Sequence, residues 1–130
     1  MDKTLVSRTG ILRAPLALLA GFLALSSAAA HFLVAPAPFQ EWGGYGVFFL
    51  VVASLQVLYG LGFLVRKARL AVSSWYLVGG ILGSLLVMEV YVVSRMLGVP
   101  LLGPHAGHVE PIGAIDILSK ALELGLVATL

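Results

Sequence analysis

The sequence of 130 residues contains no cysteine and few charged residues. Without thiols the chain cannot form disulfides, thiolate metal sites or iron–sulfur clusters, so any bound metal must use His, Asp, Glu, Met or backbone oxygen. Charged residues make up 11% of the chain, whereas soluble domains contain about 25%. The basic residues lie beside apolar runs and form no continuous patch, so we expect no nucleic-acid partner.

Apolar residues are abundant instead and make up 60% of the sequence. They gather in four largely uncharged runs, which are separated by charged residues or by Gly- and Pro-rich segments. Because about 20 apolar residues cross a bilayer, these runs predict membrane-spanning helices at about 14–35, 42–65, 71–94 and 112–130. Four spans leave little chain for a water-soluble domain, so we expect a single transmembrane domain over residues 1–130.

Basic residues near the ends of these runs predict the orientation. Lys3, Arg8 and Arg13 precede the first run, and residues 66–69 between the second and third contain three more. The expected loops 36–42 and 96–111 contain neither Lys nor Arg. The positive-inside rule then places both termini in the cytoplasm and these loops outside, in the plasma membrane. Short connections favour an all-α, up-down-up-down four-helix transmembrane bundle.

The N-terminus has an alternative interpretation as a secretory signal peptide. A basic start, an apolar stretch and the small residues 27–30 before His31 match an A-x-A cleavage site. Apolar residues continue past that site through Phe32, Leu33 and Val34. This continuation favours a membrane span that stays in the mature chain.

Two pairs of small residues mark the third run. Gly79 and Gly83 are four residues apart, as are Gly80 and Ser84. Small residues with this spacing let a second membrane helix approach closely. The pattern predicts helix packing there and indicates no chemistry.

Charged residues also occur inside the predicted spans, where they are costly and suggest a functional site. Asp116, Lys120 and Glu123 share one face of the last helix. Glu89 lies at a similar depth to Lys120, so we expect these two to pair, and Gln56 offers another polar partner. Three carboxylates against one ammonium predict that some acids are protonated, hydrated or balanced by a bound cation. A structural network that fixes helix register is the alternative.

All three histidines fall at the predicted outer ends of the spans. The segment His105-Ala-Gly-His108-Val-Glu110 is an H-x-x-H-x-E run within a Gly- and Pro-rich loop. Imidazole and carboxylate ligands suit copper, zinc or iron. We therefore expect a transition-metal ion on the outer face, held by His31, His105 and His108 with Glu41 or Glu110. Solvated loop residues are the alternative interpretation.

Two segments resemble parts of small uncharacterised four-span bacterial integral membrane proteins. They are HFLVAPAPFQEWGGYGVFFL, residues 31–50, and GPHAGHVEP, residues 103–111, which precedes an Asp-bearing last helix. The resemblance covers most of the chain from His31 onward and implies a four-helix membrane fold. The family carries no established activity, so no site residue is transferred from it.

Three functional hypotheses fit these patterns. The first is a membrane protein whose outer-face metal site is coupled to the intramembrane cluster, for ion or proton passage or for redox coupling. The second is a non-catalytic accessory subunit of a larger membrane complex of respiratory or oxidase type. The third is a quinone- or lipid-binding enzyme, which only the aromatic residues favour. Four short helices leave little room for a transport pathway within a single chain, which favours a homo-oligomer or partner membrane subunits.

Overall fold

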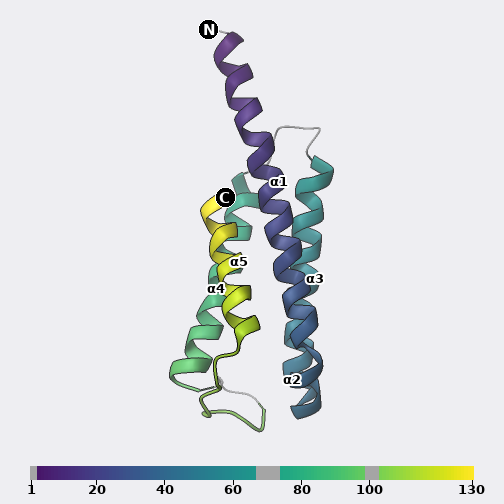
Figure 1. The fold of residues 1–130 in the computed structure, drawn as a ribbon, viewed down its shortest axis with the longest axis vertical. Coiled ribbons are helices and arrows are strands. Elements are labelled where there is room, and N and C mark those ends of the chain that lie inside the picture. Colours follow the sequence, from purple (N-terminus) through teal and green to yellow (C-terminus); the bar gives the residue numbers. More distant parts are fainter. Residues whose placement is uncertain (1–2, 67–73, 99–102) are drawn as a thin grey trace.

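The computed structural model describes residues 3–66, 74–98 and 103–130 of the chain. The described residues form helices and connections, with no strand among them. The helices are α1 (Lys3–Val34), α2 (Pro36–Glu41), α3 (Gly43–Arg66), α4 (Ser74–Met96) and α5 (Ala114–Thr129), as Figure 1 shows. The prediction of an all-helical fold is therefore confirmed.

Three stretches are long and apolar enough to cross a membrane, namely Ala14–Glu41, Gly43–Val65 and Trp75–Met96. They correspond to the first three predicted spans. The fourth predicted span coincides with α5, whose 16 residues extend over only about 24 Å. The crossing of a membrane by α5 stays a prediction.

The segment 36–42, expected as a loop, is mostly the short helix α2. Pro36 is its first residue, where the missing N–H has no intrahelical partner to lose. Trp42 then takes an extended conformation, with φ −163° and ψ 129°, and separates α2 from α3. The prolines that were expected to end helical structure therefore begin a new helix after a one-residue break at Ala35.

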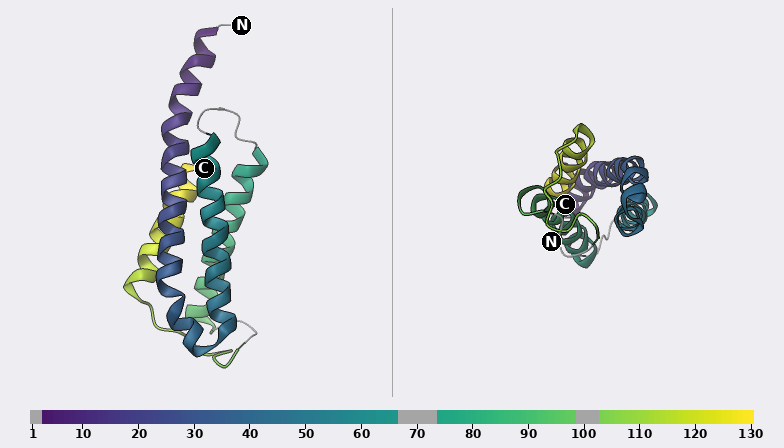
Figure 2. Two further views of the ribbon diagram at one scale, coloured as in Figure 1. Left: turned by 90° about the vertical axis from the view of Figure 1, so that its right-hand side faces the viewer. Right: turned by 90° about the horizontal axis from the view of Figure 1, so that it is seen from below.

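The helices lie side by side along one axis (Figures 1 and 2). α3 packs against α1 and runs back along it, α5 packs on another side of α1, and α4 packs against α5. One end of the molecule holds α2, the segment 103–113 and the first turn of α5, and we call it the α2 end. The first turns of α1 extend beyond the other helices at the opposite end (Figure 1).

Small residues make the contact between α1 and α3 close. If Gly60 carried a Cβ atom, that atom would lie 3.0 Å from the carbonyl oxygen of Gly21 and 2.9 Å from Cγ of Leu25. Backbone therefore packs on backbone, which is how membrane helices gain contact without a hydrophobic driving force. The buried core beside this crossing comprises Ala20, Ala24, Phe63 and Leu126.

The two small-residue pairs of α4 have different surroundings. Gly80 and Ser84 are buried, and Gly80 lies against the ring of Tyr59 in α3. Tyr59 donates a hydrogen bond to the carbonyl of Tyr76, 3.1 Å away, and Tyr76 donates one to the carbonyl of Tyr59. Gly79 is exposed and, like Gly83, has no atom within 4 Å of where its Cβ would be.

We expect the Gly60→Ala substitution to lower the free energy of unfolding by about 1–3 kcal/mol, because the new methyl group meets backbone that cannot move aside. Gly79→Ala is the matched control, since it adds the same atom in open space. There the higher helix propensity of alanine, worth up to about 1 kcal/mol, leaves stability unchanged or raised. Unfolding of both variants in detergent micelles measures the difference, and equal losses would contradict the close crossing.

Candidate functional site

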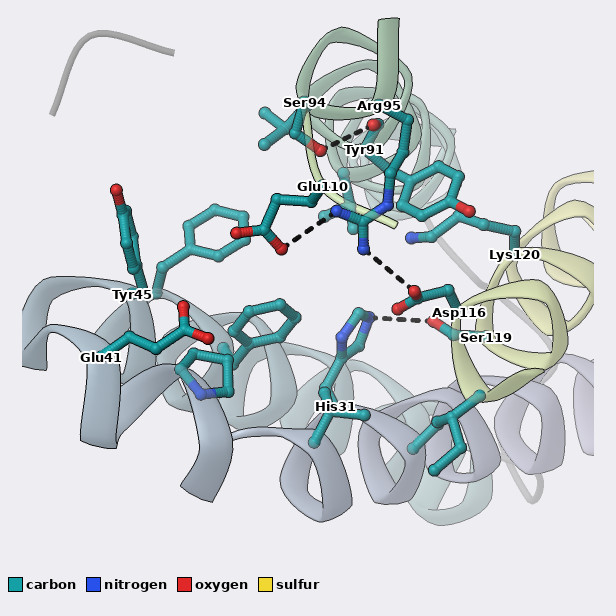
Figure 3. Close-up of a pocket in the computed structure, with 18 of the residues that line it drawn as sticks. His31, Glu41, Tyr45, Tyr91, Ser94, Arg95, Glu110, Asp116, Ser119 and Lys120 are labelled. Atoms are coloured by element: carbon teal, nitrogen blue, oxygen red, sulfur yellow. Dashed lines mark hydrogen bonds and ion pairs between the residues drawn. The ribbon is translucent and has the colours of Figure 1, made fainter. Parts of the chain in front are cut away.

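A pocket of about 340 Å³ lies between the helices at the α2 end (Figure 3). Its apolar walls include Ala30, Val34, Phe48, Phe49, Val87, Val90 and Ile115. The polar side chains that line it come from α1, α2, α3, α4, α5 and the segment before α5. They are His31, Glu41, Tyr45, Tyr91, Ser94, Arg95, Glu110, Asp116, Ser119 and Lys120, all labelled in Figure 3.

Glu123 lies behind the pocket and is fully buried. Its Oε1 atom is 2.9 Å from Nε2 of His31, 3.2 Å from Nε2 of Gln56 and 3.5 Å from Oγ of Ser27. Its Oε2 atom accepts from Nζ of Lys120 at 2.5 Å. We call these five residues the buried carboxylate cluster. Because an ionised carboxylate only accepts hydrogen bonds, this arrangement implies that Nε2 of His31 carries a hydrogen.

The cluster joins three helices at one point. His31 and Ser27 come from α1, Gln56 comes from α3, and Glu123 and Lys120 come from α5. His31 is 3% exposed. Its Nε2 atom also lies 3.4 Å from Oγ of Ser119, a residue that lines the pocket, so His31 lies between the cluster and the pocket. A buried carboxylate is tolerated here because polar donors surround both of its oxygen atoms.

Arg95 organises a second group, which we call the arginine cluster. Its Nη1 atom donates to Glu110 at 3.1 Å, and its Nη2 atom donates to Asp116 at 2.9 Å. The guanidinium also lies 5.1 Å from the centre of the Tyr91 ring. Asp116 in turn accepts the backbone N–H of Gly113 at 2.9 Å and so caps α5. Through these bonds the end of α4 holds the start of α5.

The charges of the two clusters nearly balance. Arg95 and Lys120 supply two positive charges, and Glu110, Asp116 and Glu123 supply three negative charges, so these five side chains together carry a net charge of −1. Each of the three carboxylates has a cationic partner. The excess of acids expected from the sequence is therefore smaller than predicted, since Arg95 turns inward with 14% of its side chain exposed.

The predicted intramembrane cluster is brought together only in part. Lys120, Glu123 and Gln56 meet, whereas Asp116 pairs with Arg95. Lys120 does not pair with Glu89, because its ammonium lies over the ring of Tyr91, 5.3 Å from the centre. Tyr91 and Glu89 are two residues apart and so point to different sides of α4. The predicted pair of Glu89 and Lys120 rested on their similar depth along the helices and not on the side of α4 that carries Glu89. In the structure Glu89 is exposed.

The five residues expected to bind a metal lie in different places. His31 belongs to the buried carboxylate cluster and Glu110 to the arginine cluster. Nε2 of His105 is 3.8 Å from Oε2 of Glu41, and the ring centres of His105 and His108 are 6.3 Å apart. Over residues 3–66, 74–98 and 103–130, no group of three or more His, Asp or Glu side chains lies close enough to hold a metal ion. Metal binding stays a prediction.

Several residues of the site were not expected from the sequence. Arg95 directly follows the predicted span 71–94 and is the one basic residue on a side otherwise free of Lys and Arg in the predicted topology. Ser27 precedes His31 by four residues, and Ser119 precedes Glu123 by four. This spacing places each hydroxyl on the same helix face as a titratable group and could have indicated both serines.

Comparison of the chain with protein-family models, with curated proteins and with solved structures finds no match. The resemblance to four-span bacterial membrane proteins therefore stays a prediction. The pocket and its two clusters are the features of the described residues that bear on function.

We expect Lys120→Met to lower the free energy of unfolding by about 3–5 kcal/mol, because it leaves the buried carboxylate of Glu123 without its cation. The double variant Lys120→Met with Glu123→Gln should regain part of this loss, since no unpaired charge then remains buried. Glu89→Gln is the control and should change stability by no more than about 0.5 kcal/mol. A Lys120→Met protein as stable as the parent in micelle unfolding would show that the pair contributes nothing.

Proposed function

We propose that this protein is a multi-pass membrane protein that binds a lipid-soluble ring compound of the quinone class in the pocket at the α2 end. The observation that carries the proposal is the composition of the pocket, in which aromatic and aliphatic walls enclose a group of hydrogen-bond donors. Its volume of about 340 Å³ falls within the range of small-molecule sites.

The walls fit a flat apolar ring. Phe48 and Phe49 of α3 line the pocket together with Tyr91 of α4, and the ring centres of Phe48 and Phe49 are 5.6 Å apart in an edge-to-face arrangement. Aromatic rings gain from offset or edge contacts with a further ring. Val90 and Ile115 add branched aliphatic surface of the kind that packs against an isoprenoid chain.

The polar side of the pocket fits a neutral ligand with carbonyl oxygens. Arg95 and Lys120 present N–H donors, and Ser119 presents a hydroxyl beside His31 (Figure 3). Glu110, Asp116 and Glu123 are already paired with these cations, and the three carboxylates outnumber the two cations. An anionic ligand would meet this negative charge and compete for paired cations, whereas a quinone carbonyl needs only one donor.

The membrane setting of the proposal rests on three helices that are long and apolar enough to cross a bilayer. We further propose that α5 is a fourth span, that both termini are cytoplasmic, and that the α2 end faces outward from the plasma membrane. The distribution of Lys and Arg supports this orientation. The ring of the ligand would then lie close to the outer interface.

Tryptophan fluorescence tests quinone binding, because the two tryptophans lie at opposite ends of the membrane-spanning helices. Trp42 lines the pocket, whereas Trp75 is 84% exposed near the start of α4. The Trp75→Phe protein retains only Trp42. We expect a short-chain ubiquinone to quench the fluorescence of this protein, and the quenching should saturate as the quinone concentration rises. The matched Trp42→Phe protein should show only weak quenching that rises linearly with quinone in the micelle.

A pocket-filling pair of variants serves as the control. Val90→Phe adds bulk to a pocket wall and should weaken binding at least about fivefold, the equivalent of roughly 1 kcal/mol. Val92→Phe adds the same bulk to an exposed position of α4 and should leave binding unchanged. Equal linear quenching of both tryptophans, unaffected by Val90→Phe, would disprove a quinone site in the pocket.

Metal binding is a second candidate function, and the pair of His105 with Glu41 favours it. Their side chains are 45% and 48% exposed, and His108 lies beside them. Metal analysis of the protein after incubation with copper or zinc tests it, with loss expected in His105→Ala and in Glu41→Gln. Glu110→Gln should keep the metal, because Glu110 bonds to Arg95 instead. Equal metal content in all variants would disprove this site.

A further inference from the structure

Two serines line the pocket, and their hydroxyl groups are engaged differently. Ser94 of α4 donates to the carbonyl of Tyr91 at 2.7 Å, so its hydrogen is used within its own helix. Ser119 of α5 is 4% exposed, and its Oγ atom lies 3.4 Å from Nε2 of His31. Among the residues that the structure describes, this nitrogen is the one hydrogen-bond partner of the Ser119 hydroxyl.

Nε2 of His31 cannot accept the hydrogen of Ser119. It lies 2.9 Å from Oε1 of Glu123, a carboxylate that is paired with Lys120 and therefore only accepts. Nε2 carries a hydrogen toward that carboxylate whether the imidazole is neutral or charged. Ser119 can accept weakly from this nitrogen, which leaves its own O–H without an acceptor in the described parts of the chain. A buried hydroxyl in this position is stabilised when a ligand supplies the acceptor.

The unused hydrogen of Ser119 belongs to a buried wall of the pocket, beside aromatic surface (Figure 3). Phe49 also lines this wall, and its ring centre is 5.8 Å from that of His31. A flat ring that packs against Phe49 can therefore bring an oxygen substituent to Ser119. The other donors, Arg95 and Lys120, already bond to carboxylates, and such charge-assisted bonds are stronger than a bond to a neutral carbonyl.

We propose that Ser119 donates a hydrogen bond to a ring carbonyl oxygen of the ligand and thereby selects quinones among flat apolar rings. The inference rests on the proposed quinone site and adds the residue that recognises the carbonyl. A site with a buried donor discriminates strongly against a ligand that lacks the matching acceptor, because the donor is then left unpaired. The carbonyl end of the ring then lies at α5, next to the buried carboxylate cluster.

Substitution of the two serines tests this role through the fluorescence of Trp42, in the full chain carrying Trp75→Phe in micelles. Ser119→Ala should weaken the binding of short-chain ubiquinone about five- to tenfold, because the bound carbonyl loses a hydrogen bond. Ser94→Ala is the matched control, since it removes the same atom from the same pocket. Its hydroxyl is bonded to Tyr91, so the affinity should stay unchanged. Ser119→Cys keeps the side-chain size with a weaker donor and should give an intermediate affinity.

The infrared spectrum of the bound quinone reports the hydrogen bond directly. Acceptance of a hydrogen bond lowers the stretching frequency of a carbonyl group, and quinone isotope-labelled at its carbonyl carbons identifies the band. We expect a lowered carbonyl band in the parent and in Ser94→Ala. In Ser119→Ala the same band should move to higher frequency, which a change in the shape of the pocket alone would not produce.

The possible failures separate this inference from the proposed function. Saturable quenching with equal affinity in the parent and in Ser119→Ala would overturn the role of Ser119 and leave the quinone site standing. A carbonyl band that does not move in Ser119→Ala would do the same, since any loss of affinity would then come from packing. A parent protein without saturable quenching would overturn the quinone site and the role of Ser119 together.

Discussion

The fold depends on one buried carboxylate. Glu123 contributes to α5 a charged group with no exposed surface, and such a group is stable only when donors surround it. Those donors come from His31 and Ser27 of α1, Gln56 of α3 and Lys120 of α5. The rotation of α1 and α3 about their own axes is therefore fixed by the need to bring polar side chains to this point. Apolar packing alone would tolerate many rotations of such uniformly hydrophobic helices.

The two clusters attach α5 to the other helices at different points along its length. The buried carboxylate cluster fixes the middle of the helix against α1 and α3, while Arg95 of α4 fixes its first turn through Asp116. The pocket lies between these two attachments, where branched and aromatic side chains meet and each of the three carboxylates has a cationic partner. Tyr59 and Tyr76 join α3 to α4 away from the pocket. The pocket thus lies at the end of the bundle where the charged clusters lie.

Much of the architecture could be predicted from the sequence, and the facing of particular side chains could not. Apolar run length gave the membrane-capable helices, because it depends on local composition alone. Depth along a helix also follows from counting residues, which is why Glu89 and Lys120 were expected to meet. Which side of α4 turns inward depends on tertiary packing, and Tyr91 rather than Glu89 turned out to face Lys120. The segment 36–42 was predicted as a loop from its prolines at 36 and 38, yet most of it is the helix α2. Proline ends helices but is also favoured at their first position, so its presence alone does not decide between the two.

His31 belongs to both the buried carboxylate cluster and the wall of the pocket. A molecule that bonds to this imidazole from the pocket side acts on the same ring that anchors α5 to α1. Occupancy and folding are then thermodynamically linked, since any ligand that prefers the folded chain stabilises it in proportion to the logarithm of its concentration. The melting temperature of the purified protein consequently rises when a ligand occupies the pocket. A panel of lipid-soluble compounds can therefore be ranked by the shift in melting temperature that each one causes.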